Sequence, residues 1–323
     1  MIPPVYCASP GRYESGMRYR RCGRSGVLLP EISLGLWHNF GSVDPLQKSV
    51  EIIHYAFDHG ICHFDLANNY GPAYGSAEDT FGMIMKRSLA PYRDELFIST
   101  KAGHDMWPGP YGEWGSRKYL MASLDQSLKR MNLDYVDLFY SHRYDPETPL
   151  EETMQALVDI VKSGKALYVG ISKYPREKAL QAYRYLAERD VKCLAYQGRF
   201  NMLDTAVEDD GILADAFEHG VGFTAFSPLA QGLLTDRYLN GIPLDSRIGR
   251  GGYLKEKDLT PEVLEKIRRL NEEAGRRGTT TAAKAISWLL DKPAVTSVIV
   301  GASSVGQLKA NLEGCGLTNR DSE

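Results

Sequence analysis

From residue 31 onward, short apolar runs alternate with longer segments in which apolar side chains recur every three or four positions. The short runs have the length of strands, and the longer segments have the spacing of a helix that buries one face. The first pair is a run at 31–37 and a segment at 46–60 that ends in Gly60, a residue common after helices. Seven further pairs follow, always with the strand first: 61–67 and 76–89, 95–103 and 116–132, 135–143 and 149–164, 166–172 and 175–190, 193–201 and 211–220, 222–229 and 260–278, 296–302 and 304–313.

This alternation predicts a closed barrel. Strands that are apolar on both faces and separated by helices are typical of parallel sheets with crossover connections. Eight strand-helix units favour a (β/α)8 TIM barrel with the helices outside. A doubly wound open sheet would place Gly-x-Gly-x-x-Gly after its first strand, and LGLWHNFGS at 34–42 lacks that motif.

Three segments add to the barrel. Residues 17–30 alternate around Gly23-Arg24-Ser25-Gly26, which predicts an N-terminal β-hairpin. The segment between Leu229 and Leu259 is too long for an ordinary βα loop, so we expect a lid after the seventh strand. Residues 279–293 predict an additional helix before the last strand. We expect one domain over residues 1–323.

Composition excludes several classes of protein. A net charge of −3 over 323 residues gives no electrostatic reason for binding nucleic acid or an anionic membrane. No apolar stretch approaches the roughly 20 residues that would span a bilayer, and the N-terminus does not resemble a secretory signal. The five cysteines show no CxxC pairing, which favours a reducing cytoplasm and predicts no metal site.

Ionisable residues gather where three successive strands end. Asp65 closes the second strand, Tyr70 lies in the loop after it, Lys101 closes the third, and His142 closes the fourth. Each alone is more often a cap, surface or packing residue. Because the carboxyl ends of parallel barrel strands meet at one mouth, we expect the four side chains to lie together.

Together these residues predict a proton-donating centre. A tyrosine has an ordinary pKa of about 10, so it needs a nearby cation to stabilise its phenolate. Lys101 supplies that cation, Asp65 keeps the buried lysine charged, and His142 hydrogen-bonds the substrate oxygen. No serine or cysteine nucleophile with a neighbouring base is evident, so the centre suits proton transfer to a carbonyl oxygen, with electrons from another source.

Six segments, in this order, resemble the aldo-keto reductase superfamily: FDLANNYG, ISTKAG, DLFYSHR, YVGIS, FSPLAQGLL and VIVGASSVGQLKANL. Within it, LGLWHNFG, STKAGHDMWPGPYG and SLDQSLKRMNLDYVDLFYSHR are most similar to the branch of bacterial L-glyceraldehyde 3-phosphate reductases and, less closely, voltage-gated potassium channel β subunits. The resemblance implies a barrel that binds NADPH across its mouth and reduces an aldehyde or ketone.

The resemblance also implies roles for single residues. Tyr70 would be the proton donor, Lys101 and Asp65 would tune it, and His142 would orient the carbonyl; channel β subunits have an asparagine at this last position. The implied contacts to NADPH are Leu36, Trp37, Asp65, Ser172, Lys173, Gln197, Ser227, Pro228, Leu229, Ala230, Gln231, Arg237, Arg247, Gly301, Ser303, Gln307 and Asn311. Among them, Gln197 would lie beside the nicotinamide, and segment 227–231 and Arg247 would cover the pyrophosphate. The last four residues of the list would hold the adenosine. At the adenosine end of the cofactor, the backbone N–H groups at the N-terminus of the predicted helix 304–313 would favour a phosphate.

The chain departs from the family pattern at two places. Ala310 stands where relatives of the channel β type have a glutamate for the adenine amino group, so adenosine binding is expected to differ. The sequence ends at GLTNRDSE, where relatives continue into a further helix, so we expect either that the sequence is truncated or that part of the substrate pocket's cover is absent.

The substrate is expected to be a small carbonyl compound. The loop 104–114, with Trp37, predicts an aromatic wall through Trp107, Tyr111 and Trp114. Arg143 and Arg199 could bind a phosphate or could form structural ion pairs. Two other functions stay open, namely a regulatory module that senses NADPH and an isomerase or aldolase that uses Lys101 as a Schiff base. A homo-oligomer is also open.

Overall fold

The computed structural model describes residues 6–244, 246–249 and 254–317. Eight parallel strands close into a barrel in the order β10-β3-β4-β5-β6-β7-β8-β9, which confirms the predicted (β/α)8 class. The strands are β3 (Ile32–Gly35), β4 (His63–Asp65), β5 (Phe97–Ala102), β6 (Val136–Ser141), β7 (Ala166–Ser172), β8 (Cys193–Arg199), β9 (Gly222–Phe226) and β10 (Val295–Val300).

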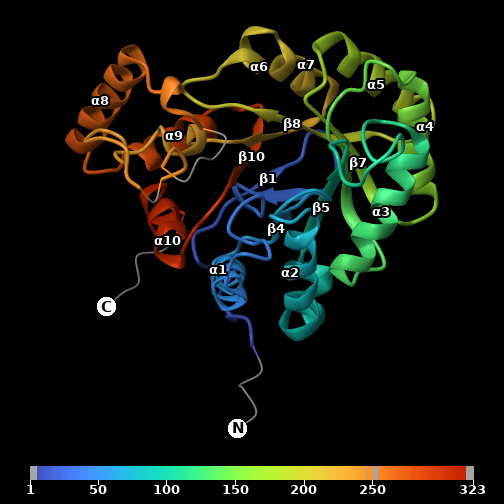
Figure 1. The fold of residues 1–323 in the computed structure, drawn as a ribbon, viewed down its shortest axis with the longest axis horizontal. Helices are drawn as coiled ribbons and strands as arrows, with labels where there is room; N and C mark the ends of the chain where they lie inside the picture. The colour runs from blue at the N-terminus through green and yellow to red at the C-terminus, as the bar shows by residue number, and fades with distance from the viewer. Residues whose placement is uncertain (1–5, 245, 250–253, 318–323) are drawn as a thin grey trace.

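Helices lie outside these strands, as Figure 1 shows most clearly for α2 to α5. Their buried faces carry the apolar residues whose spacing predicted them, and these pack on the barrel in one large core. The α-helices are α1 (Leu46–Asp58), α2 (Ser76–Ile84), α3 (Arg117–Met131), α4 (Leu150–Lys162), α5 (Arg176–Ala187), α6 (Ala206–Asp209), α7 (Ile212–His219), α8 (Pro261–Arg276), α9 (Thr281–Leu290) and α10 (Val305–Gly314).

The predicted hairpin is present as strands β1 (Tyr19–Arg21) and β2 (Leu28–Pro30), which pair antiparallel. It covers the N-terminal end of the barrel, since Cys22 packs beside Leu194 near the start of β8. The Arg24 N–H donates to the carbonyl of Gly220, two residues before β9, at 2.8 Å. The opposite, C-terminal end of the barrel therefore remains available for a site.

Three details differ from the sequence prediction. The helix expected over 76–89 is α-helical only to Ile84 and continues as a π-helical turn (Met85–Leu89) and a 3-10 turn (Ala90–Glu95). Helix α6 was not predicted, because four residues carry too little periodicity to be seen. The long loop after β9 contains two 3-10 turns, Ala230–Gly232 and Glu256–Asp258.

Candidate active site

The structure brings the predicted ionisable residues together at the C-terminal mouth. Lys101, in β5, is fully buried, and its Nζ donates to Asp65 Oδ2 at the end of β4 and to the carbonyl of Leu66, both at 2.6 Å. The same Nζ lies 3.4 Å from the hydroxyl of Tyr70. One ammonium thus joins the carboxylate to the phenol. These contacts follow from the register, which pairs Asp65 with Ser99 and so sets Lys101 two residues further along the neighbouring strand.

The Asp65 carboxylate is held from the inside of the barrel. Its Oδ1 accepts from Ser99 Oγ at 2.7 Å and from Gln197 Nε2 at 3.1 Å. Ser99 Oγ lies 2.9 Å from His63 Nε2, and His63 Nδ1 lies 2.7 Å from Ser33 Oγ. Burial lowers the pKa of His63 to about 4, so this histidine is neutral and serves as a hydrogen-bonding member of the chain.

Burial dominates the electrostatics of the centre. It raises the pKa of Tyr70 well above 10, with the Asp65 charge as a second cause, so the phenol is protonated at neutral pH. Burial also lowers the pKa of Lys101, while the Asp65 carboxylate opposes that change. The Tyr70 hydroxyl therefore carries its proton at rest, and the Lys101 ammonium lies where it would stabilise a phenolate.

His142 lies beside Tyr70, with the two rings edge to face and their centroids 5.9 Å apart. Burial, followed by the charges of Lys173 and Lys101, lowers its pKa well below 6.5, so the imidazole is neutral. Its Nδ1 is buried and has no hydrogen-bond partner among the residues that the structure describes. A neutral imidazole with an unused nitrogen can hydrogen-bond a substrate oxygen.

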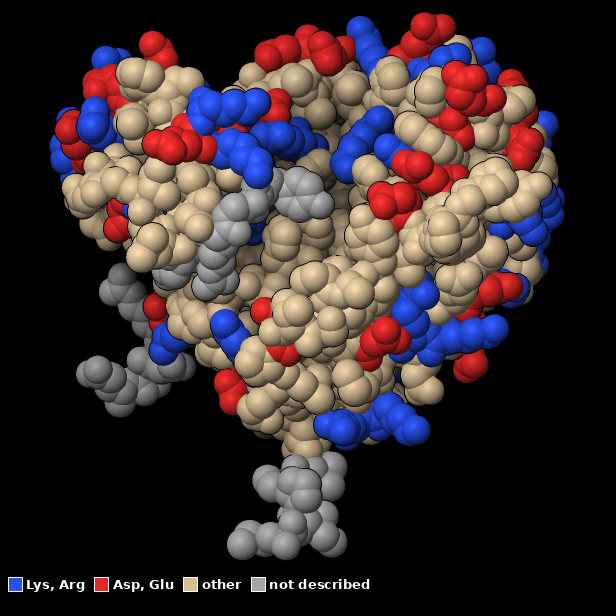
Figure 2. Space-filling view, viewed as in Figure 1, with Lys and Arg blue, Asp and Glu red and all other residues tan. Residues whose placement is uncertain are grey.

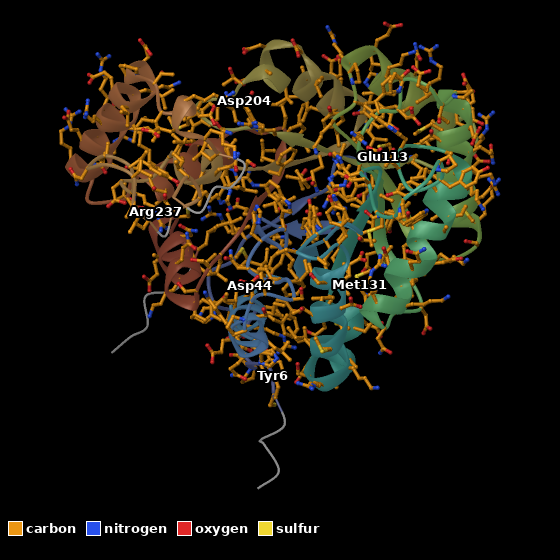
Figure 3. All side chains as sticks on the ribbon, viewed as in Figure 1. Tyr6, Asp44, Glu113, Met131, Asp204 and Arg237 are labelled. Atoms are coloured by element: carbon orange, nitrogen blue, oxygen red, sulfur yellow. The ribbon has the colours of Figure 1, made fainter. Side chains whose placement is uncertain are left out.

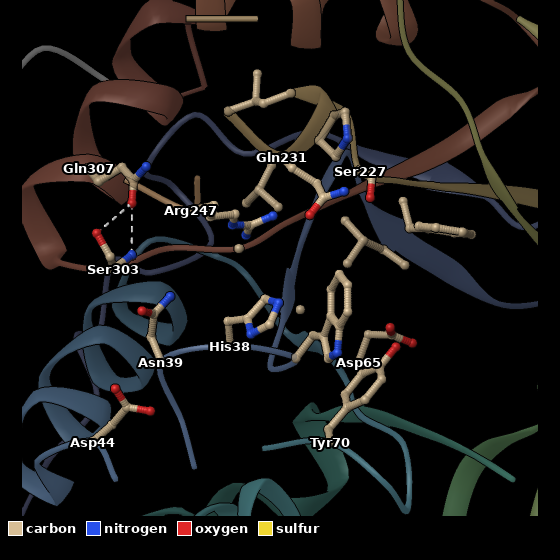
Figure 4. A pocket seen from close by; sticks show the side chains of 18 of the residues that line it. His38, Asn39, Asp44, Asp65, Tyr70, Ser227, Gln231, Arg247, Ser303 and Gln307 are labelled. Carbon is tan, nitrogen blue, oxygen red and sulfur yellow. Dashed lines mark hydrogen bonds between the residues drawn. The ribbon is translucent and has the colours of Figure 1, made fainter. Parts of the chain in front are cut away.

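A pocket of about 600 Å³ extends from Asp65 and Tyr70 toward α10, which is a usual size for a small-molecule site. Figure 4 shows His38 and Arg247 in its middle, between Gln307 and Tyr70. Figure 2 shows basic side chains on both sides of the hollow in this face of the molecule. Besides Asp65 and Tyr70, the predicted residues that line the pocket are Trp37, Ser227, Pro228, Leu229, Gln231, Arg237, Arg247, Gly301, Ser303 and Gln307.

The other predicted residues do not line this pocket. Lys101 and His142 are buried next to Tyr70, and the Lys173 Nζ lies 5.6 Å from the ring centroid of Phe226, which lines the pocket. Leu36, Ser172, Gln197, Ala230 and Asn311 are buried. Ser303 N–H donates to the Gln307 side chain at 2.7 Å, so this helix-start donor is already used, as the dashed lines in Figure 4 show.

Sequence reasoning missed several pocket residues, among them His38, Asn39, Asp44, Lys48 and Tyr238. His38 and Asn39 directly follow the first strand segment, so the strand-end rule that found Asp65 would have found them as well. Lys48 lies in the first turn of α1, where a single lysine carries no distinguishing signal. Burial, with the nearby charge of Arg247, lowers the pKa of His38 to about 4.

The aromatic loop expected at the mouth is anchored by Arg143. Its guanidinium stacks 3.6 Å from the ring centroid of Trp114, donates to the carbonyl of Gly103 at 2.8 Å, and pairs with Glu113. In the view of Figure 3, Glu113 lies at the upper right and Arg237 of the long loop at the left. Arg199 pairs with Asp204 at 3.0 Å. Both arginines therefore hold structural ion pairs.

Replacing Arg143 by methionine is expected to raise the KM for aldehydes by about tenfold while kcat changes little. The loss of the stack and of two charged contacts frees the loop, and tenfold corresponds to about 1.4 kcal/mol. Steady-state kinetics would measure it. Arg143→Lys keeps the charge without the planar stack, so a wild-type KM in that variant would contradict the anchoring role.

The described residues show neither a metal centre nor a membrane-spanning helix. They contain no cluster of three or more His, Cys, Asp or Glu side chains that could hold a metal ion. None of their helices combines the length and the apolar character that a membrane crossing requires.

Comparisons with known proteins agree with this geometry. Residues 31–323 match the model of the aldo/keto reductase family. The chain is 55% identical to L-glyceraldehyde 3-phosphate reductase of Escherichia coli K12 over 314 residues, which cover 96% of this chain and 90% of the relative. It is 36% identical to a probable voltage-gated potassium channel subunit beta of Arabidopsis thaliana over 303 residues, 92% of this chain and 90% of the relative. The chain therefore belongs to the aldo/keto reductase family and is an oxidoreductase that acts on carbonyl compounds.

Proposed function

We propose that this protein reduces short aldehydes and ketones to alcohols with NADPH, and that L-glyceraldehyde 3-phosphate and methylglyoxal-like aldehydes are among its substrates. The observation that carries the proposal is the ammonium of Lys101, which joins Asp65 to the hydroxyl of Tyr70 at the edge of the pocket. The likeness to L-glyceraldehyde 3-phosphate reductase supports the choice of substrate.

The pocket suits a nicotinamide dinucleotide with several phosphates. Three basic side chains line it, Lys48, Arg237 and Arg247, and burial lowers the pKa of Arg247, which favours an anionic partner. Gln231, which lines the pocket, has its Oε1 buried without a partner among the described residues, so this oxygen can accept a hydrogen bond from a ligand. Bound NADPH would supply the hydride.

The protein's own residues would then handle the proton. Tyr70, protonated at rest, donates to the carbonyl oxygen as it becomes an alkoxide. Lys101 stabilises the resulting phenolate, and Asp65 keeps that ammonium in place. His142, neutral and with Nδ1 free of a partner in the described structure, positions the oxygen between itself and Tyr70.

The geometry does not favour a Schiff base on Lys101. That chemistry needs a neutral amine with a free lone pair. Lys101 has no exposed surface, and its donors are directed to Asp65, Leu66 and Tyr70. Its attack on a carbonyl would require these contacts to break inside the barrel.

The likeness to a probable channel β subunit supports a second candidate, an NADPH-binding regulatory module with little turnover. A kinetic panel separates the two. Oxidation of NADPH and NADH would be followed at 340 nm with glyceraldehyde 3-phosphate, glyceraldehyde and methylglyoxal. Turnover of an aldehyde with NADPH in preference to NADH is expected. Tight NADPH binding without turnover of any aldehyde would instead favour the regulatory module.

We further propose that residues 1–323 form one barrel domain and that the protein works in the cytoplasm. All five cysteines are free thiols, as expected in a reducing compartment. The proposal leaves a homo-oligomer open.

A further inference from the structure

A second group of basic side chains lies next to the proton-donating centre of Asp65, Tyr70, Lys101 and His142, outside the pocket that extends toward α10. Lys173 follows β7 and His104 follows β5, and the Lys173 Nζ lies 3.3 Å from the His104 Nε2. The His104 ring meets the His142 ring edge to face, with centroids 4.6 Å apart. His142 in turn touches Tyr70. Lys173 and His104 therefore lie next to His142, which would orient the carbonyl, and one ring away from Tyr70.

No carboxylate forms an ion pair with Lys173 or His104 within the described residues. Asp65 is used by Lys101, and Glu113 is used by Arg143. Asp105, next to His104 in the chain, accepts from the hydroxyl of Tyr74 at 2.8 Å, and its charge only partly opposes the lowering of the His104 pKa. Part of the Lys173 side chain is exposed to solvent, so a ligand can reach its charge, although neighbouring atoms cover the rest.

The surroundings disfavour positive charge while the site is unliganded. Burial, followed by the charges of Lys101 and Arg143, lowers the pKa of Lys173 to about 8. Burial, followed by Lys173 and Arg143, lowers the pKa of His104 to about 4. An anion beside the pair would offset the charges of Lys101 and Arg143, so its binding would favour the charged forms of Lys173 and His104.

The backbone at Lys173 is also unusual. Lys173 has φ of 55°, the left-handed region that residues with a side chain seldom occupy, and such strain is concentrated at functional sites. The conformation places a lysine where the strand meets the mouth. Directly before it, Ser172 Oγ is buried without a partner among the described residues.

We propose that Lys173 and His104 bind an anionic group, a phosphate or a carboxylate, on the carbonyl substrate, and so select anionic aldehydes over neutral ones. The proposal rests on the reductase activity proposed above and names its substrate class. Lys173 and His104 thus take the place of Arg143 and Arg199 as the candidate phosphate-binding residues, because those guanidinium groups are already paired with Glu113 and Asp204.

The test compares kcat/KM for two matched pairs of aldehydes in wild type and in Lys173→Met. The phosphate pair is glyceraldehyde 3-phosphate and glyceraldehyde, and the carboxylate pair is succinic semialdehyde and butanal. The ratio of anionic to neutral kcat/KM is expected to fall about tenfold or more in the variant for the group that binds, because one charge-assisted contact is lost. The arm that falls identifies the group. Lys162→Met, an exposed lysine on α4, is the control and should leave both ratios unchanged.

Two results would overturn the proposal. One is a pair of ratios that stay at the wild-type values in Lys173→Met. The other is a weaker affinity for NADPH in that variant, with unchanged ratios, which would place Lys173 against the cofactor.

A failure of the reductase proposal is separable from this one. If wild type turns over no aldehyde, titration calorimetry with glycerol 3-phosphate and with succinate still reports the anion site. Binding in wild type that is lost in Lys173→Met would support the anion site. Equal affinity in both proteins, or no binding in wild type, would contradict it.

Discussion

Tyr70→Phe is expected to lower kcat for aldehyde reduction by about a hundredfold to ten-thousandfold, because it removes the proposed proton donor and leaves the ring in place. NADPH affinity should change little, since the loss is one hydroxyl at the edge of the pocket. Stopped-flow or steady-state oxidation of NADPH would measure the rate, and quenching of tryptophan fluorescence would measure cofactor binding.

Tyr74→Phe is the matched control for this experiment. Tyr74 is 51% exposed in the same loop, and its hydroxyl donates to Asp105 at 2.8 Å. We expect a wild-type rate in the control. Retention of most of the activity in Tyr70→Phe would refute the assignment of the donor.

The pH profile gives a related check on Tyr70. Its pKa is raised, so the protonated, active form persists as the pH rises past 9. Deprotonation of Tyr70 should therefore cause no loss of reduction between pH 7 and 9.

The preference for anionic aldehydes should decline between pH 7 and 9, because Lys173, with His104, Lys101 and Arg143 around it, has a pKa of about 8 and loses its charge.

Lys101→Met is expected to lower the free energy of unfolding by about 3–5 kcal/mol and to reduce kcat by at least about a hundredfold. The stability effect arises because the Asp65 carboxylate, 2% exposed, would be left buried without its cation. The activity effect arises because the phenolate of Tyr70 would lose the ammonium near it. Urea denaturation and NADPH oxidation would measure the two effects separately.

The double variant Asp65→Asn/Lys101→Met distinguishes stability from catalysis. It removes both charges, so it should recover most of the lost stability while kcat stays low. Lys165→Met is the control for an ion pair at the surface, since Lys165 and Asp125 are 37% and 45% exposed, and it should cost no more than about 1 kcal/mol. A double variant with near wild-type kcat would show that the ion pair serves the fold alone.

The barrel could be predicted because its signals are local. The two-sided apolar strands and the helices with one apolar face are each visible in a window of ten to fifteen residues, and their strict alternation leaves few topologies. The exceptions are of the same kind: α6 has four residues, and the end of α2 changes to a π-helical turn without a break in the apolar pattern.

The proton-donating centre could be predicted because its residues lie at the ends of neighbouring strands or in the loops after them. Asp65 and Lys101 end strands that are consecutive in the chain and adjacent in the barrel, so a strand count brings them together. The family motifs added the order of the cofactor segments, and the pocket is lined by many of the residues that they suggested.

The sequence by itself determined the fold class, the family and the identity of the four ionisable residues at the mouth. Only the tertiary structure decided how the remaining charges are used. Arg143 is paired with Glu113 and stacked on Trp114. Lys173, after β7, meets His104, after β5, across the end of the one strand between them, and it forms no ion pair with a carboxylate among the described residues. Strand and helix periodicity depends on which face each residue presents, whereas the pairing of a charge depends on loops far apart in the chain that meet only when the barrel closes.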